Sequence, residues 1–205
     1  DMRYILDTYI RAEDTKVVSE LGNMSLVELL LQGKTTTPTD LVKDLPGNNE
    51  AKAETIDNNL QHEIVKKMSS NSVYYGKLSE MLKKIIMQRK IEAMSYEEYL
   101  RQVVELAEAI LHPETSGSYP DEVKDSAARR ALYDYFEQNV ELTIDVDGAI
   151  RVSIRPEWKR NFQKQQRIRL AVYQKLLLHN YTEDKATEET NNVFDIAQRQ
   201  EEYDA

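Results

Sequence analysis

The sequence predicts an all-α fold, a multi-helix bundle-like domain, and three observations carry this prediction. Apolar residues recur at helical spacing through most of the 205 residues. The chain holds only six glycines and five prolines, and 31% of its residues are charged, a composition typical of long solvent-exposed helices. Ser25 with Glu28, and Ser95 with Glu98, form the Ser-x-x-Glu pattern that starts helices.

Each expected helix has an apolar stripe on one face, and turn residues separate it from the next. The helices are expected at residues 25–32, 49–68, 72–93, 95–112, 121–138, 162–178 and 186–203. For the central four, the buried stripes are expected to consist of Ile56, Leu60, Ile64 and Met68; Tyr74, Leu78, Met81, Leu82 and Ile85; Tyr99, Val103, Leu106 and Ile110; and Val123, Ala127, Ala131 and Tyr135.

Residues 142–154 fit two kinds of structure. Apolar residues alternate on either side of Asp147-Gly148, a dipeptide typical of a tight turn between two strands. Helical spacing also fits, because Leu142, Val146, Ile150 and Ile154 follow one another at intervals of four. The local pattern favours a minor β-hairpin, and a helix is the alternative.

The chain is expected to divide into two helical parts. Residues 1–112 form the first part, residues 113–120 are a linker rich in Pro, Ser and Gly, and residues 121–205 form the second. The second part contains a basic stretch at 151–175, with a net charge of +7, and an acidic tail at 183–205, with a net charge of −6.

The composition also limits the class of protein. The chain has no cysteine, and no apolar run approaches the roughly 20 residues that cross a membrane, so we expect a cytoplasmic protein without membrane contact. Its net charge of −9 argues against a surface that binds nucleic acid everywhere. The chain starts at Asp1 with a patterned segment, and we expect it to be a piece of a longer protein.

No catalytic, cofactor-binding or metal-binding residue is expected. Gly33-Lys34-Thr35 resembles the end of a phosphate-binding loop, but Glu28 stands where that loop needs its first glycine. The segment 143–154 resembles part of a calcium loop, but Thr143 and Ile154 occupy the positions of its two strongest carboxylates. The acids of residues 120–124 are adjacent and are interpreted as a helix start rather than a nuclease site.

The candidate contact residues lie in the basic stretch. Arg160, Lys164 and Arg167 are spaced for one cationic stripe on a helix, and Arg169 lies beside them in the sequence. Three interpretations remain open for this stripe: a solvated face partly neutralised by the acidic tail, a contact with an acidic protein partner, and a contact with nucleic acid.

Several sequence blocks resemble, in the same order, the C-terminal region of the restriction and translocation (R) subunit of type I restriction-modification enzymes. These blocks are residues 1–13, 24–29, 53–59 and 88–100, followed by Ile144-Asp145, Ala149-Ile150-Arg151, Trp158 and Lys164. The resemblance covers essentially the whole chain. It implies a helix at 144–151, which decides between the two structures for 142–154 in favour of the helix.

The resemblance also implies a function. Enzymes of this family are ATP-dependent, site-specific deoxyribonucleases that use ATP and magnesium, with nuclease and motor domains preceding this region. By implication, the present chain is a non-catalytic part that anchors the motor subunit to the methyltransferase (M) and specificity (S) subunits, and meets DNA through the assembled complex. The alternative is a module that binds or guides duplex DNA directly through residues 151–175.

Overall fold

The computed structural model describes residues 45, 47–115 and 119–204, and every regular element in these residues is a helix. The all-α, bundle-like prediction is therefore confirmed for this part of the chain. The expected helix at 25–32 and the Gly33-Lys34-Thr35 motif lie outside the described residues.

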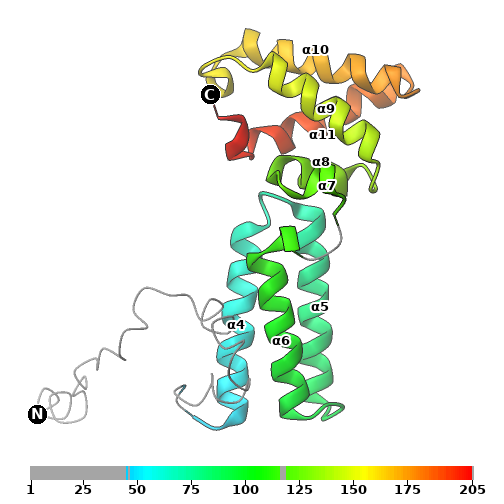
Figure 1. The fold of residues 1–205 in the computed structure, drawn as a ribbon. Coiled ribbons are helices and arrows are strands. Elements are labelled where there is room, and N and C mark those ends of the chain that lie inside the picture. Colours follow the sequence, from blue (N-terminus) through cyan, green and yellow to red (C-terminus); the bar gives the residue numbers. More distant parts are fainter. Residues whose placement is uncertain (1–44, 46, 116–118, 205) are drawn as a thin grey trace, which may run out of the picture.

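Three long helices, α4 (Asn49–Lys67), α5 (Ser72–Lys90) and α6 (Tyr96–Leu111), pack side by side as a bundle (Figure 1). Each begins at a side chain that accepts a hydrogen bond from a backbone amide three residues later; these caps are Asn48, Asn71 and Ser95. The expected stripes lie inside the bundle with one clear error, because Met81 is 49% exposed. The outermost stripe position on α5 therefore faces solvent.

A buried polar cluster ties the three bundle helices together at one end. Arg89 Nη2 of α5 donates to Asp57 Oδ2 of α4 at 2.7 Å, and Tyr99 OH of α6 donates to Asp57 Oδ1 at 2.8 Å. Arg89 Nη1 also donates to Glu50 at 2.6 Å. Because both Asp57 oxygens have donors, the carboxylate is satisfied within the core.

The second part of the chain packs around a separate apolar core. The short turn η3 (Pro113–Thr115) lies in the expected linker. The elements of the second part are α7 (Asp121–Lys124), α8 (Ala127–Tyr135), α9 (Val140–Ser153), η4 (Trp158–Arg160), α10 (Phe162–Leu178), α11 (Glu183–Gln198) and η5 (Glu201–Tyr203). Helix α10 packs along both α9 and α11, and Trp158 is 1% exposed beside the ring of Phe194. The two clusters of buried apolar residues lie on either side of residues 113–120.

The single helix expected at 121–138 is in fact two helices. Helix α7 ends at Lys124, and Ser126 caps a new helix by accepting a hydrogen bond from the Arg129 amide at 3.2 Å. Because α8 does not continue α7, its buried side differs from the side that one continuous helix would bury. Ala127, expected on the buried stripe, is exposed, and Ala128 is buried. A capping serine inside an apolar pattern therefore restarts the helix.

Residues 140–153 form a helix, not a hairpin. The Asn139 side chain caps α9 by accepting from the Leu142 amide at 3.0 Å, and Leu142, Val146 and Ile150 are all buried on its inner face. Gly148 lies within the helix instead of in a turn. The helical alternative is therefore confirmed, although the strand-like alternation was the stronger local pattern.

The last helix lies one turn earlier than expected. Thr182 caps α11, which starts at Glu183 instead of Ala186 and ends at Gln198. Residues 201–203 then form the short turn η5, which places the Tyr203 ring inside the second core.

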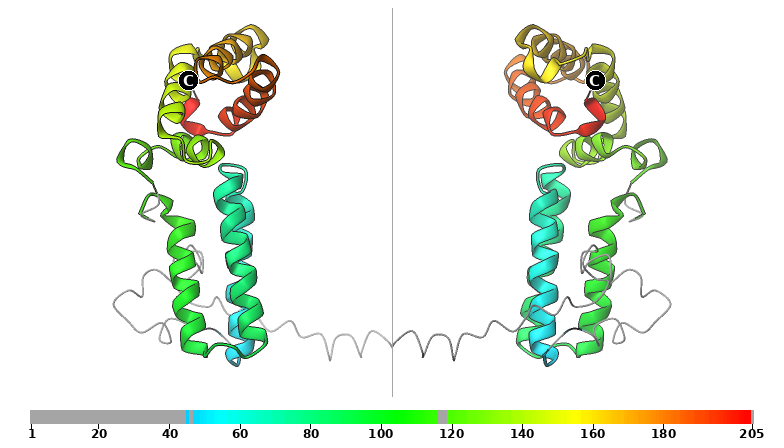
Figure 2. Two further views of the ribbon diagram at one scale, coloured as in Figure 1. Left: turned by 90° about the vertical axis from the view of Figure 1, so that its right-hand side faces the viewer. Right: turned by 90° about the vertical axis from the view of Figure 1, so that its left-hand side faces the viewer.

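The two parts meet end to end, as the views in Figures 1 and 2 agree. At the junction, Asn71 Nδ2 and Tyr119 OH both donate to Asp134 Oδ2 at 2.6 Å, and Gln200 Nε2 donates to the Ser70 carbonyl at 2.8 Å. The loop between α4 and α5 is therefore held by α8 and by the C-terminal turn.

Alkaline pH is expected to unfold the chain and ionise its buried tyrosines in one step. Burial raises the pKa of Tyr75 to about 12, and burial together with the carboxylates of Asp57 and Asp147 raises the pKa of Tyr99 and Tyr203. The folded state thus favours the protonated phenols. The contribution of these raised pKa values to the free energy of unfolding is complete below the ordinary tyrosine pKa of about 10. It is lost as the pH rises above that value, because the unfolded chain then releases the phenol protons first.

Tyrosinate absorbance and helical circular dichroism, recorded in the same titration, test this expectation. The difference between wild type and Tyr99→Phe isolates the Tyr99 signal, which is expected to rise only as the helical signal is lost. Ionisation of Tyr99 near pH 10 in a chain that is still helical would contradict it.

Candidate interaction surface

The basic stretch runs from the end of α9 through η4 and most of α10. Asn161 caps this helix by accepting a hydrogen bond from the Lys164 amide at 3.1 Å, and the first turn contains no acidic residue. The amino end of a helix carries partial positive charge, so cations there are unfavourable by a few tenths of a kcal/mol unless an anion compensates them. The charge distribution therefore favours an anionic contact from outside the helix.

Four of the eight basic residues in 151–175 pair with a carboxylate or pack on an aromatic ring within the protein. Arg151 pairs with Asp147 at 2.8 Å and with Glu202 at 2.9 Å, and the Lys159 ammonium pairs with Asp204. The other two internal contacts are those of Lys175, which pairs with Asp145 at 3.6 Å, and Arg169, whose guanidinium lies 3.8 Å from the Phe194 ring centroid and bonds Asn191.

The other four basic residues, Arg155, Arg160, Lys164 and Arg167, are here named the cationic cluster. The Lys164 ammonium donates to the Pro156 carbonyl at 2.6 Å, and Arg155 donates to backbone carbonyls at the end of α9. Arg155, Arg160 and Arg167 are exposed, and no carboxylate of the described residues forms an ion pair with any member of the cluster. Their positive charge is therefore available at the surface.

The predicted contact residues are brought together only in part. Arg160 belongs to η4 and precedes the cap of α10, so Arg160, Lys164 and Arg167 come from two elements instead of one helical stripe. Arg169 faces α11 and packs on Phe194, so it is not part of this surface. Arg155, which the sequence prediction did not single out, belongs to the cationic cluster instead. Its distance of five residues from Arg160 does not match the spacing of three or four residues that marks one face of a helix.

The acidic tail neutralises part of the basic stretch from within. Glu202 accepts hydrogen bonds from Ser126, from Arg151 and from the first amides of α8. Burial, the largest influence, acts to raise the pKa of Glu202, but these hydrogen bonds outweigh it and the pKa lies below its usual value. The negative charge at the start of α8 is also favourable for the helix dipole.

A buried carboxylate of the second part was also missed by sequence reasoning. Asp147 is fully buried and accepts hydrogen bonds from Arg129 Nε at 2.7 Å, Arg151 Nε at 2.8 Å and Tyr203 OH at 2.8 Å. The only local signal was the spacing of four between Asp147 and Arg151, which is common on solvated helix faces. Its saturated oxygens indicate a structural role.

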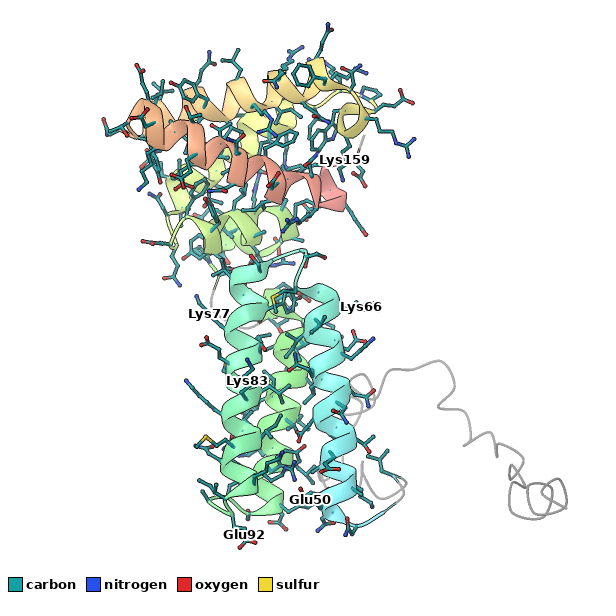
Figure 3. All side chains as sticks on the ribbon, turned by 180° about the vertical axis from the view of Figure 1, so that it is seen from behind. Glu50, Lys66, Lys77, Lys83, Glu92 and Lys159 are labelled. Carbon is teal, nitrogen blue, oxygen red and sulfur yellow. The ribbon has the colours of Figure 1, made fainter. Side chains whose placement is uncertain are left out.

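The remaining charged groups are dispersed. Figure 3 shows Lys159 on the second part, whereas Lys66, Lys77 and Lys83 are spread along α4 and α5.

Among the described residues, no three His, Asp or Glu side chains gather as a metal site would require, and none of the helices there is long and apolar enough to cross a membrane. Asp121 at the start of α7 pairs with Lys124 at 2.7 Å.

Comparisons with family models, with curated proteins and with solved structures found no match to this chain.

Proposed function

We propose that this chain is the helical, non-catalytic C-terminal part of the R subunit of a cytoplasmic type I restriction-modification enzyme. In this role it anchors the motor subunit to the M and S subunits. The sequence blocks that resemble this family in order support the proposal. The observation that carries it in the structure is the cationic cluster, whose three arginines are exposed and which lacks an acidic partner among the described residues.

A protein partner with an acidic face suits this surface better than DNA does. The whole chain carries a net charge of −9, which repels a phosphate backbone at long range. Half of the basic stretch is already paired or packed internally, so only four cations are offered outward. Four cations are fewer than the six to ten phosphate contacts of typical DNA-binding proteins, but they suffice to steer a protein partner.

The alternative function is direct guidance of duplex DNA by the same cluster. The lack of acidic residues in the first turn of α10 favours it, because helix amino ends also bind phosphates. Both functions use the same side chains. They differ in which binding event those side chains support.

A pull-down of the 205-residue chain with purified M and S subunits, with and without DNA, tests the anchoring function. We expect capture of the M–S complex without DNA. The chain alone is expected neither to hydrolyse ATP nor to cleave DNA, and either activity in a stringently purified preparation would contradict the non-catalytic assignment. Capture that requires DNA would support the guidance alternative.

Changing Arg160, Lys164 and Arg167 together to Ala is expected to weaken association with the M–S complex on the order of tenfold, mainly through slower encounter. Surface plasmon resonance at several salt concentrations measures both rates. The control changes Lys77, Lys83 and Lys90 to Ala, which removes the same charge from exposed positions on α5.

The DNA alternative predicts a different result from the same two variants. Duplex affinity would then fall with salt at a log-log slope of about −0.9 per neutralised phosphate, and the cluster variant would flatten this slope by up to about three units. A salt-sensitive, submicromolar complex with duplex that the cluster variant abolishes and the α5 control does not would overturn the anchoring proposal.

A further inference from the structure

The outer side of α9 and α10 carries an unusual number of exposed apolar side chains. Helix α10 forms the layer farthest from the α4–α6 bundle (Figure 1). Nine large apolar side chains are exposed among the described residues, and five of these belong to α9 and α10: Val152, Phe162, Leu170, Leu177 and Leu178. Val152 and Leu178 are both 73% exposed. Leu170, Leu177 and Leu178 lie within about 100° of one another around α10, and exposed apolar residues that share a face are typical of an interface.

A groove between these two helices gives the surface its shape. It has a volume of about 450 Å³, and small residues, Gly148 and Ala149 of α9 and Ala171 of α10, line it between Val152 and Leu178. A Cβ atom added at Gly148 would meet no atom within 4 Å. The glycine therefore leaves space that nothing in the described protein fills. We name the surface formed by this groove and the exposed leucines of α10 the outer face.

Charge is distributed unevenly along the outer face. At one end, Glu141 is exposed, while Asp145 and Lys175 both line the groove and pair with each other, and Asp145 also pairs with His179. At the other end, beyond Val152, lie exposed Arg155 and Arg167. The uncompensated negative charge at one end is therefore that of Glu141, whereas the opposite end presents two cations that form no ion pair with a described residue.

We propose that the outer face binds the outer face of a second copy of this chain, in antiparallel orientation about a two-fold axis near Gly148. This arrangement is self-complementary in charge. Glu141 lies in the first turn of α9 and Arg155 lies two residues beyond its end, so the rotation brings the end of α9 near Arg155 in one copy against the end that carries Glu141 in the other. A parallel arrangement would instead place like charges together.

The apolar groups match under the same rotation. Gln174 lines the groove together with Gly148, and Leu170 and Leu178 stand four residues before and after it. Leu170 of one copy therefore meets Leu178 of the other, twice in the dimer. At the axis, Gly148 allows the two α9 helices to approach closely.

The dimensions predict a weak dimer. Helix α10 has 17 residues and is about 25 Å long, and two adjacent helices are about 20 Å wide, so the face buries on the order of 500 Å² in each copy. A total of about 1,000 Å² lies at the lower limit for a specific interface, and a dissociation constant in the micromolar range is expected. This inference does not rest on the proposed anchoring function.

Sedimentation of the 205-residue chain from about 1 µM to about 500 µM tests the dimer. We expect reversible dimerisation, which Gly148→Leu weakens at least tenfold because a bulky side chain separates the two α9 helices. The control is Gly76→Leu. Gly76 is also within a helix with no atom within 4 Å of an added Cβ, but it belongs to α5. Equal circular dichroism of both variants excludes misfolding.

Disulfide trapping tests the orientation, and the native chain contains no cysteine that could interfere. A mixture of Leu170→Cys and Leu178→Cys chains is expected to form mixed disulfide dimers under mild oxidation. Either variant alone is expected to form few, because identical positions lie about 12 Å apart along the helix axis, beyond disulfide reach.

Two results would overturn the proposal. The first is a monomer throughout the concentration range, and the second is a dimer that Gly148→Leu leaves unchanged. If the first result is accompanied by loss of M–S binding in the Gly148→Leu variant, the face belongs to a contact with a different protein. Loss of M–S binding by the cluster variant alone concerns the anchoring proposal and not this one.

Discussion

Replacing Asp147 by Ala is expected to lower the free energy of unfolding by about 3–5 kcal/mol. The fully buried carboxylate receives Arg129, Arg151 and Tyr203. Removing it leaves the buried Tyr203 phenol without its acceptor and takes a carboxylate partner from Arg129 and Arg151, whose side chains are 35% and 38% exposed. A hydrogen bond to a charged group contributes about 1.5–3 kcal/mol, so the loss of all three costs several kcal/mol although both guanidinium groups reach solvent. Urea unfolding followed by circular dichroism measures the change.

Asp145→Ala is the matched control for this prediction. Asp145 lies on the same helix and also pairs with two basic side chains, Lys175 and His179, but its side chain is 42% exposed. Exposed ion pairs contribute about 1 kcal/mol or less, so the control is expected to change stability by no more than that. Similar losses for both variants would show that burial of Asp147 does not control its contribution.

Local sequence signals predicted the starts of several capped helices closely, although not that of α11, which Thr182 also caps. Asn48, Ser95 and Asn161 each precede a helix whose start was expected within one residue of its true position. A cap is a short-range interaction between a side chain and the next turn, so the local sequence contains it completely. The same interaction at Ser126 was overlooked because the apolar pattern continued across it.

The sequence alone did not predict the long-range contacts. Tyr203 reaches Asp147 across 56 positions of the chain, and Trp158 Nε1 donates to the Tyr203 carbonyl across 45. No periodicity relates such distant residues. For the same reason, the basic stretch could be recognised as basic, but its division into internally paired cations and the exposed cluster depended on where α11 and the C-terminal turn pack.

The helix at α9 illustrates how packing decides an ambiguous pattern. As a hairpin, the segment would place Asp147 in an exposed turn. As a helix, it buries Leu142, Val146 and Ile150 on one side and brings Asp147 to Arg129 and Tyr203. The helical form therefore satisfies both the apolar and the charged side chains, which the alternation of local hydrophobicity does not reveal.

Leu78→Ala is expected to cost about 2–4 kcal/mol of unfolding free energy, whereas Met81→Ala should change it by about 0.5 kcal/mol or less. The two residues are three positions apart on α5, and sequence periodicity placed both on its buried stripe. In the fold, Leu78 is 5% exposed in the bundle core, while Met81 is 49% exposed at the rim of a groove between α5 and α6.

The difference arises from the direction in which each side chain leaves the helix. Truncating Leu78 opens a cavity among helices that cannot close around it, so the transfer and cavity contributions add. Truncating Met81 removes methylene groups that water already contacts, and no cavity forms. Urea unfolding measures the two losses when the free energy of unfolding of both variants falls with urea concentration at the same slope. Equal losses would show that α5 is rotated about its axis relative to the described packing, and a larger loss at Met81 would place the rim of that groove inside the core.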